Sequence, residues 1–115
     1  MRYLILLYGD EAAERALSPD ERRAIVEEHT ALGRRLREAD AVVENAPLQA
    51  PSSAKVLRRR AGRPIVTDGP FAETKEQLGG FYLLECKDVD EALAWAEQVP
   101  ESPGLVVEVR PVASV

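Results

Sequence analysis

The first apolar run of the chain covers residues 2–8, and its only charged side chain is Arg2. A strand wetted on one face would alternate apolar and polar residues, so this run predicts a strand with both faces covered. The Gly9-Asp10 pair predicts the end of that strand. Other runs rich in aliphatic residues predict strands over 41–44, 81–86 and 105–109.

The clearest helix signal begins at Ser18. A proline follows directly, and Glu21 stands three residues on, which is the pattern of a capping box. Further residues recur at spacings of four, three and four, so the helix runs to about residue 39 with one face toward the core: Ile25, His29, Leu32 and Leu36. A second cap at Asp88 predicts a shorter helix that ends before Pro100.

Two short segments, 55–59 and 65–67, flank Ala61-Gly62-Arg63 and predict a β-hairpin. The element order is then strand, helix, strand, hairpin, strand, helix, strand. Without the hairpin this order is βαββαβ. We therefore predict a single α+β domain over residues 1–115, ferredoxin-like, with an inserted hairpin, an antiparallel sheet and two helices on one face.

The sheet face opposite the helices needs a cover. Residues 2–8 alternate between the two faces, yet both sets are apolar: Tyr3, Ile5, Leu7 on one and Leu4, Leu6, Tyr8 on the other. A large exposed apolar face usually marks an interface, so we predict a homodimer packed through its sheets, a dimeric α+β barrel. The alternative is that the 47–53 loop and the hairpin fold over this face.

The net charge and the cysteine content argue against several classes of protein. The net charge of −5 argues against a nucleic-acid partner, because binding to phosphates depends on Lys and Arg. The basic run Arg58-Arg59-Arg60 lies in a predicted strand and is interpreted as a solvated hairpin edge. Cys86 is the only cysteine, so no disulfide forms within the chain. The short apolar start predicts no membrane segment, and we expect a cytoplasmic protein.

One long segment of the chain is distinctive: Thr67-Asp68-Gly69-Pro70-Phe71-Ala72-Glu73-Thr74-Lys75-Glu76-Gln77-Leu78-Gly79-Gly80-Phe81-Tyr82. It resembles the YCII-related proteins of the DGPF type, and the similarity extends over residues 1–10, 88–100 and 107–111. The resemblance implies a ferredoxin-like fold that dimerises through its sheets and an association with extracytoplasmic-function sigma factors, but no established reaction.

His29, the only histidine, is the main candidate for chemistry. On the inner face of a helix it is either a core residue with a satisfied hydrogen bond or a group tuned for proton transfer. The resemblance implies a His–Asp pair, with His29 at the matching helix position and Asp68 in the matching loop. Asp68 before Gly-Pro is equally a natural turn residue. Tyr8, at the end of the first strand, and Lys75, in the polar loop, are the candidate substrate-binding residues.

Other chemistries find little support in the sequence. A zinc site ordinarily needs several His or Cys ligands, and the chain has one of each, so we expect neither metal nor cofactor. Gly79-Gly80 lacks the spacing of a phosphate loop. Two hypotheses follow. The first is a cofactor-independent small-molecule enzyme in which His29 is the acid/base and Asp68 orients it. The second is a non-enzymatic ligand-binding or regulatory module associated with a sigma factor.

Overall fold

Four antiparallel strands form the main sheet of the computed structural model, which describes residues 1–114. The spatial order is β2-β5-β1-β6. The predicted α+β class and antiparallel sheet are confirmed, and the strand order is consistent with a ferredoxin-like arrangement. The bounds are β1 (Arg2–Asp10), β2 (Val42–Pro47), β5 (Glu76–Glu85) and β6 (Val106–Pro111).

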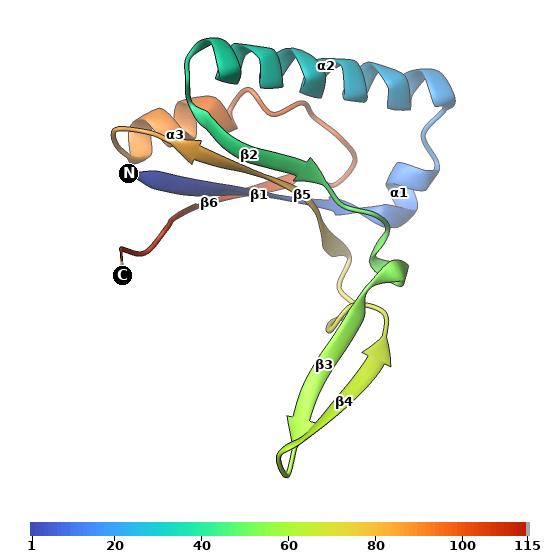
Figure 1. Ribbon diagram of the computed structural model, residues 1–115. Helices are drawn as coiled ribbons and strands as arrows, with labels where there is room; N and C mark the ends of the chain where they lie inside the picture. The colour runs from blue at the N-terminus through green and yellow to red at the C-terminus, as the bar shows by residue number, and fades with distance from the viewer. Residues whose placement is uncertain (115) are drawn as a thin grey trace.

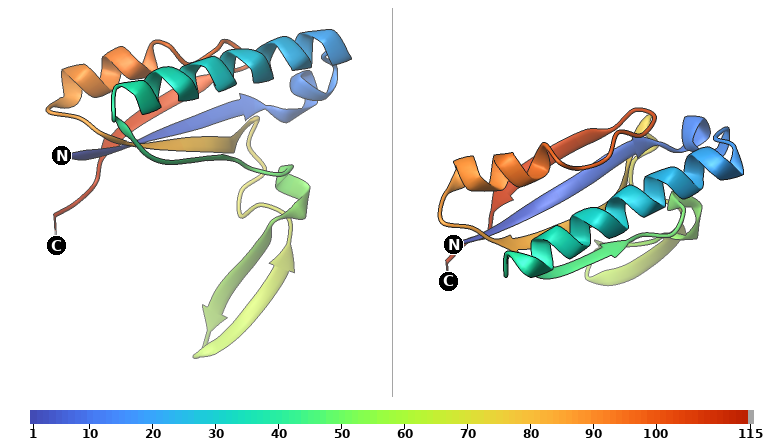
Figure 2. Two further views of the ribbon diagram at one scale, coloured as in Figure 1. Left: turned by 45° about the horizontal axis from the view of Figure 1, so that its top comes forward. Right: turned by 90° about the horizontal axis from the view of Figure 1, so that it is seen from above.

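Two helices, α2 (Pro19–Glu38) and α3 (Val89–Ala96), lie side by side over one face of the sheet (Figures 1 and 2). The predicted capping box is present: Ser18 Oγ accepts from Glu21 N–H at 3.1 Å, and Glu21 Oε1 accepts from Ser18 N–H at 3.0 Å. Between the helices and the sheet lies the core, in which the deepest side chains are Ile5, Leu32, Leu36 and Leu84.

The connection from β1 to α2 differs from the prediction. β1 continues through Gly9 to Asp10, and a third helix, α1 (Glu11–Arg15), follows at once. Asp10 caps it, because one carboxylate oxygen accepts from Ala13 N–H at 3.3 Å. The prediction of two helices was therefore incomplete, and the predicted end of the strand at Gly9-Asp10 was too early.

The predicted hairpin is confirmed and forms a separate two-stranded sheet, β3 (Lys55–Arg60) and β4 (Arg63–Asp68), after a short 3₁₀ turn, η1 (Pro51–Ser53). We call residues 55–68 the arm. Figure 1 shows it projecting from the sheet on the side opposite α2 and α3. The Cα radius of gyration is 16.0 Å, against about 13 Å for a compact chain of this length, because the arm extends outward.

The sheet face opposite the helices, which we call the open face, has an apolar centre. Strand alternation turns Tyr3 and Ile5 into the core, so their neighbours point the other way. The register places four half-buried apolar side chains together there: Leu4, Leu6, Phe81 and Leu83. No helix described in residues 1–114 is long and apolar enough to span a bilayer.

Candidate functional site

His29 lies on the inner face of α2, where it meets the sheet. Its Nδ1 is 2.7 Å from the hydroxyl of Tyr82 on β5, and the two rings are stacked at 6.1 Å between centroids. Tyr82 is buried, with 7% of its surface exposed. When the ring proton sits on Nδ1, His29 donates to the Tyr82 oxygen and Nε2 keeps a free lone pair. The hydrogen bond therefore holds the ring in one orientation.

A cavity of about 380 Å³ opens beside His29. It lies between α1, the first half of α2, the ends of β1 and β5, and the segment that leads to the arm. Most of its wall is apolar, formed by Leu7, Leu17, Ile25, Val26, Leu48, Leu78 and Leu105. A second cavity of about 410 Å³ runs along α2 toward β2 and is also lined by His29, together with Tyr82. His29 is thus the titratable residue common to both spaces.

Glu14 on α1 brings a carboxyl group to the first cavity. Its side chain folds over the backbone of Gly9, and a Cβ at position 9 would overlap the Glu14 Oε1 atom. Gly9 is buried, so the carboxyl group lies against the end of β1 and loses part of its hydration. A glycine at this position is therefore what makes room for the acid.

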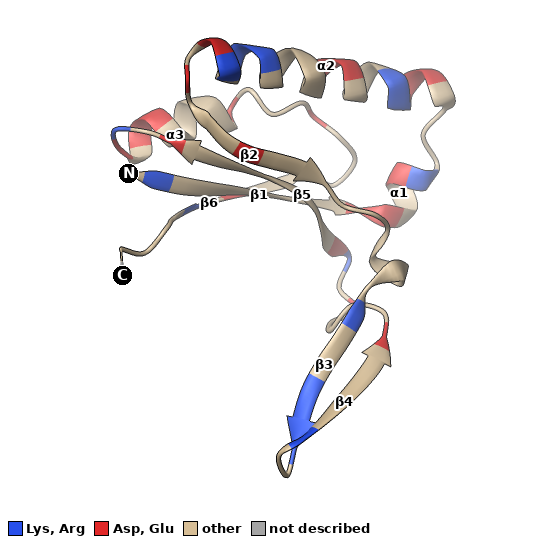
Figure 3. Cartoon of the chain, viewed as in Figure 1, with Lys and Arg blue, Asp and Glu red and all other residues tan. Residues whose placement is uncertain are grey.

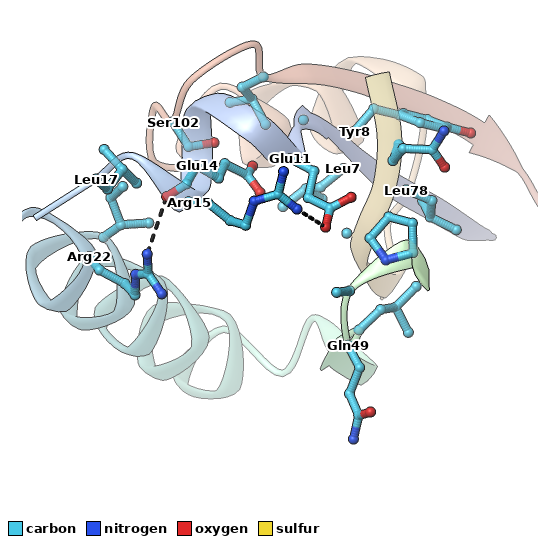
Figure 4. Close-up of a pocket in the computed structure, with 18 of the residues that line it drawn as sticks. Leu7, Tyr8, Glu11, Glu14, Arg15, Leu17, Arg22, Gln49, Leu78 and Ser102 are labelled. Atoms are coloured by element: carbon cyan, nitrogen blue, oxygen red, sulfur yellow. Dashed lines mark hydrogen bonds and ion pairs between the residues drawn. The ribbon is translucent and has the colours of Figure 1, made fainter. Parts of the chain in front are cut away.

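Charged groups gather at the α1 end of the cavity (Figure 4). Arg15 donates to Glu11 Oε1 at 2.8 Å, which closes an ion pair within α1. Arg22, from the first turns of α2, donates to the Glu14 carbonyl oxygen at 3.3 Å. The Arg22 contact ties α2 to α1 at the residue whose carboxyl group lines the cavity.

The environments of His29 and Glu14 shift their acidities in opposite directions. Burial lowers the pKa of His29 below its ordinary value, and the nearby charge of Glu28 opposes this only in part. Burial raises the pKa of Glu14, and the charges of Asp10 and Glu11 raise it further, against the lowering effect of Arg22. Both shifts favour the neutral form, so the cavity combines a neutral imidazole with a carboxyl group that holds its proton to higher pH.

Asp68 has a different partner from the one predicted. It stands at the end of β4, is largely exposed, and forms an ion pair with Lys55 across the arm. It lines neither of the two cavities that His29 borders. Within one chain the structure therefore joins His29 to Tyr82 and Asp68 to Lys55, and the His29–Asp68 pair stays a prediction.

The two predicted substrate-binding residues are placed differently from each other. Tyr8 lines the first cavity, while its hydroxyl donates to Glu108 Oε1 at 3.1 Å on the open face. Burial is the main reason that the pKa of Tyr8 is raised. Lys75 lies outside the lining, with its Nζ 3.9 Å from an Asp10 carboxylate oxygen.

Sequence reasoning missed Tyr82 and Glu14. Tyr82 is 53 positions from His29, and no local pattern pairs them. Glu14 follows from recognising Asp10 as a helix cap, a signal that was present in the sequence. Among residues 1–114, no three His, Cys, Asp or Glu side chains gather as a metal site would require, and we assign no metal ligand.

Comparison with known proteins gives a family and one close relative. The family described as YCII-related domain matches residues 1–115 of this chain. An uncharacterized protein of Rhizobium meliloti (strain 1021) is 42% identical over 115 residues, which cover 98% of this chain and 93% of the relative.

Proposed function

The chain belongs to the YCII-related family, and the Rhizobium meliloti relative is described as an uncharacterized protein, so we propose a function from the cavity. The protein is a cofactor-independent enzyme that transfers protons on a small, largely apolar molecule. The observation that carries this proposal is that His29 and Glu14 line one apolar cavity of about 380 Å³. Titratable groups of shifted acidity in a shared cleft are typical of acid/base sites.

His29 takes the role of base. Its lowered pKa keeps the ring neutral at physiological pH, and in the tautomer that donates from Nδ1 to the Tyr82 hydroxyl the lone pair lies on Nε2. A bound molecule would lose an acidic proton to Nε2. Tyr82 is then a positioning residue, because it contacts the ring rather than the reacting atoms.

Glu14 takes the role of acid. Its raised pKa keeps a larger fraction of the carboxyl group protonated than an exposed glutamate would have. It would give that proton to an oxygen of the same molecule while His29 removes a proton elsewhere. The net change is an isomerisation that needs no co-reactant, and both groups return to their starting state by exchange with solvent.

Asp68 can contact His29 only if the arm rearranges or if the Asp68 comes from a second copy of the chain. In the described chain its carboxylate is engaged by Lys55. The predicted orienting role for Asp68 therefore requires either a rearranged arm or an arm from a second molecule. Tyr82 fills that role within one chain.

The test is proton exchange in D₂O. Small apolar ketones and β-keto acids are incubated with the protein, and loss of the acidic C–H signal is followed by NMR. We expect exchange faster than buffer alone with the wild type and at least about tenfold slower exchange with His29→Gln or Glu14→Gln, because each removes one proton-transfer group. Glu27→Gln is the matched control, since Glu27 is exposed and lines neither cavity.

The outcomes separate the two functional hypotheses. If His29→Gln leaves the rate of proton exchange unchanged, the enzyme hypothesis is overturned. A compound that shifts the signals of Ile25 and Val26 without exchanging its protons would favour the second candidate, a non-enzymatic ligand-binding or regulatory module. A module of that kind, associated with a sigma factor, would use the same cavity to sense a ligand.

A second copy of the chain completes the proposal. The open face holds four half-buried apolar side chains that the described chain leaves uncovered by any helix. Packing a second copy of the chain on this face would remove them from water, and the predicted dimeric α+β barrel is one arrangement that does so. The oligomeric state in solution tests this directly.

A further inference from the structure

We propose that the arm is an intermolecular clasp that packs on the open face of a second copy of this chain. The two strands of the arm pair only with each other. Every residue of the arm except Val56 is exposed. A two-stranded hairpin with no further layer is at best marginally stable in water. A partner surface is therefore the missing part of this element.

The arm carries apolar side chains that a partner would cover. Leu57 and Val66 face each other across the two strands and are 56% and 60% exposed. Ile65, which alternates to the other side, is 40% exposed. Cross-strand pairs of this kind stabilise a hairpin when something packs on them. In the described chain nothing does.

The distribution of charge between the arm and the rest of the chain favours a second copy of this chain as the partner. The arm holds five of the fifteen basic residues and one of the twenty acidic residues, so it carries +4 while the rest of the chain carries −9. Figure 3 shows the basic residues, coloured blue, concentrated along β3 toward the tip. None of Arg58, Arg59, Arg60 and Arg63 forms an ion pair within residues 1–114. A basic arm on an acidic body is complementary to a second copy of that body.

The open face offers the arm an apolar centre and an acidic edge. Glu44, Glu85 and Glu108 border the centre formed by Leu4, Leu6, Phe81 and Leu83. Glu85 is paired with the N-terminal amine and Arg2, and Glu108 with Arg110, so Glu44 is the carboxylate of this border without an ion pair in residues 1–114. An apolar pair with arginines around it fits such a surface. The arm also projects on the side of the sheet that this face occupies (Figures 1 and 2). Two chains related by a two-fold axis would each place an arm against the other's sheet.

The first test is the dimer dissociation constant of matched variants, measured by sedimentation velocity. We expect the wild type to be a dimer and Leu57→Glu to weaken it at least about tenfold, because a charge would enter the buried contact. Leu93→Glu on α3 is the control, since Leu93 is 45% exposed and the charge change is the same. It should leave the dimer unchanged. Arg59→Glu should weaken the dimer more than Arg34→Glu, and high salt should reduce that difference.

A second test locates the arm. A spin label is placed on Ala61→Cys at the tip, in a Cys86→Ala background, and these chains are mixed with ¹⁵N-labelled chains that carry no spin label. We expect broadened amide signals in β1 and β6 of the ¹⁵N-labelled partner.

Three results would overturn the clasp. They are a monomeric wild type, a dimer that Leu57→Glu leaves intact although Leu6→Glu dissociates it, and an absence of broadening in the mixed sample. The second result would mean that the sheets pair without the arm, and a monomer would mean that the arm serves a different kind of partner. Circular dichroism of each variant establishes that it is folded.

Discussion

The helix-covered sheet and the arm are both built from paired antiparallel strands, but only the sheet buries its apolar residues. Ile5 and Leu84 on the sheet are each 1% exposed, whereas Leu57 and Val66 on the arm are more than half exposed. Helices α2 and α3 supply a second layer for the sheet, and nothing in the described chain supplies one for the arm. Strand pairing is therefore shared by the two regions, while their stability has different sources.

The largest expected effect separates the two regions by their contribution to folding. Leu36→Ala should lower the free energy of unfolding by about 2–5 kcal/mol, because it leaves a cavity in the core. Excision of residues 55–68, with a short glycine linker from Ala54 to Gly69, should leave the body folded. Those two residues are already joined by a hydrogen bond of 2.7 Å at the base of the arm.

Urea unfolding followed by the fluorescence of Trp95 measures both variants. Trp95 is the only tryptophan and packs against the core, so it reports on the body alone. An excised chain without a cooperative transition would show that the arm is part of the body's stability, and the contrast between the two regions would be lost.

A smaller effect is expected from the cap of the body's longest helix. Ser18→Ala removes the acceptor for Glu21 N–H and should cost about 1 kcal/mol. Ser52→Ala, in the exposed turn before the arm, is the matched control and should be close to neutral. Equal midpoints of urea unfolding for the two variants would contradict the role of the cap.

The pH dependence of stability should have opposite signs for the two cavity residues. The pKa of His29 is lowered in the fold, so its contribution is present above about pH 6.5 and is lost as the pH falls through the folded value. The pKa of Glu14 is raised, so its contribution is present below about pH 4.3 and is lost as the pH rises through the folded value. Unfolding curves between pH 4 and 8 measure both.

Two substitutions isolate these contributions. Glu14→Gln should gain stability over the wild type as the pH rises from 4 to 7, because ionisation of Glu14 is disfavoured in the fold. His29→Gln should flatten the wild-type rise between the lowered pKa of His29 and about 6.5. If the free energy of unfolding depends on pH in the same way for the wild type and Glu14→Gln, Glu14 is not partly buried.

The smallest effects are expected in the arm. The Lys55–Asp68 ion pair is exposed, so Lys55→Ala should change the free energy of unfolding by less than about 1 kcal/mol. Asp68→Asn should leave the pKa of His29 unchanged, because Asp68 pairs with Lys55 and lines neither cavity, whereas Tyr82→Phe should shift it. An NMR titration of the single histidine measures this. A shift of about one unit on Asp68→Asn would restore the His29–Asp68 pair.

Local signals in the sequence predicted much of the body. The Ser18 capping box and the spacing of Leu32 and Leu36 gave the position and inner face of α2, because these features depend on neighbours within one or two turns. The hairpin around Ala61-Gly62 was also predicted from local signals. Both residues adopt positive φ in its turn, 51° and 77°. The short α1 was missed, because Gly9-Asp10 is both a strand breaker and the start of a helix cap.

Contacts between side chains that are far apart in the chain could not be predicted from the sequence. The contact of His29 with Tyr82 depends on how α2 crosses β5, and the ion pair of Asp68 with Lys55 depends on the register of the arm. Neither follows from spacing along the chain. The projection of the arm away from the sheet also depends on tertiary contacts that a pattern of apolar positions does not specify.

The glycine at position 9 has a consequence for how the acidity of the cavity can change. The Glu14 carboxyl group occupies the volume that a methyl group would need there, and a flexible side chain is free to move aside. Gly9→Ala would therefore turn the carboxyl group outward, rehydrate it and lower its pKa, although no ionisable residue has been replaced. A single hydrogen in place of a methyl group thus sets the proton affinity of an acid five positions along the chain.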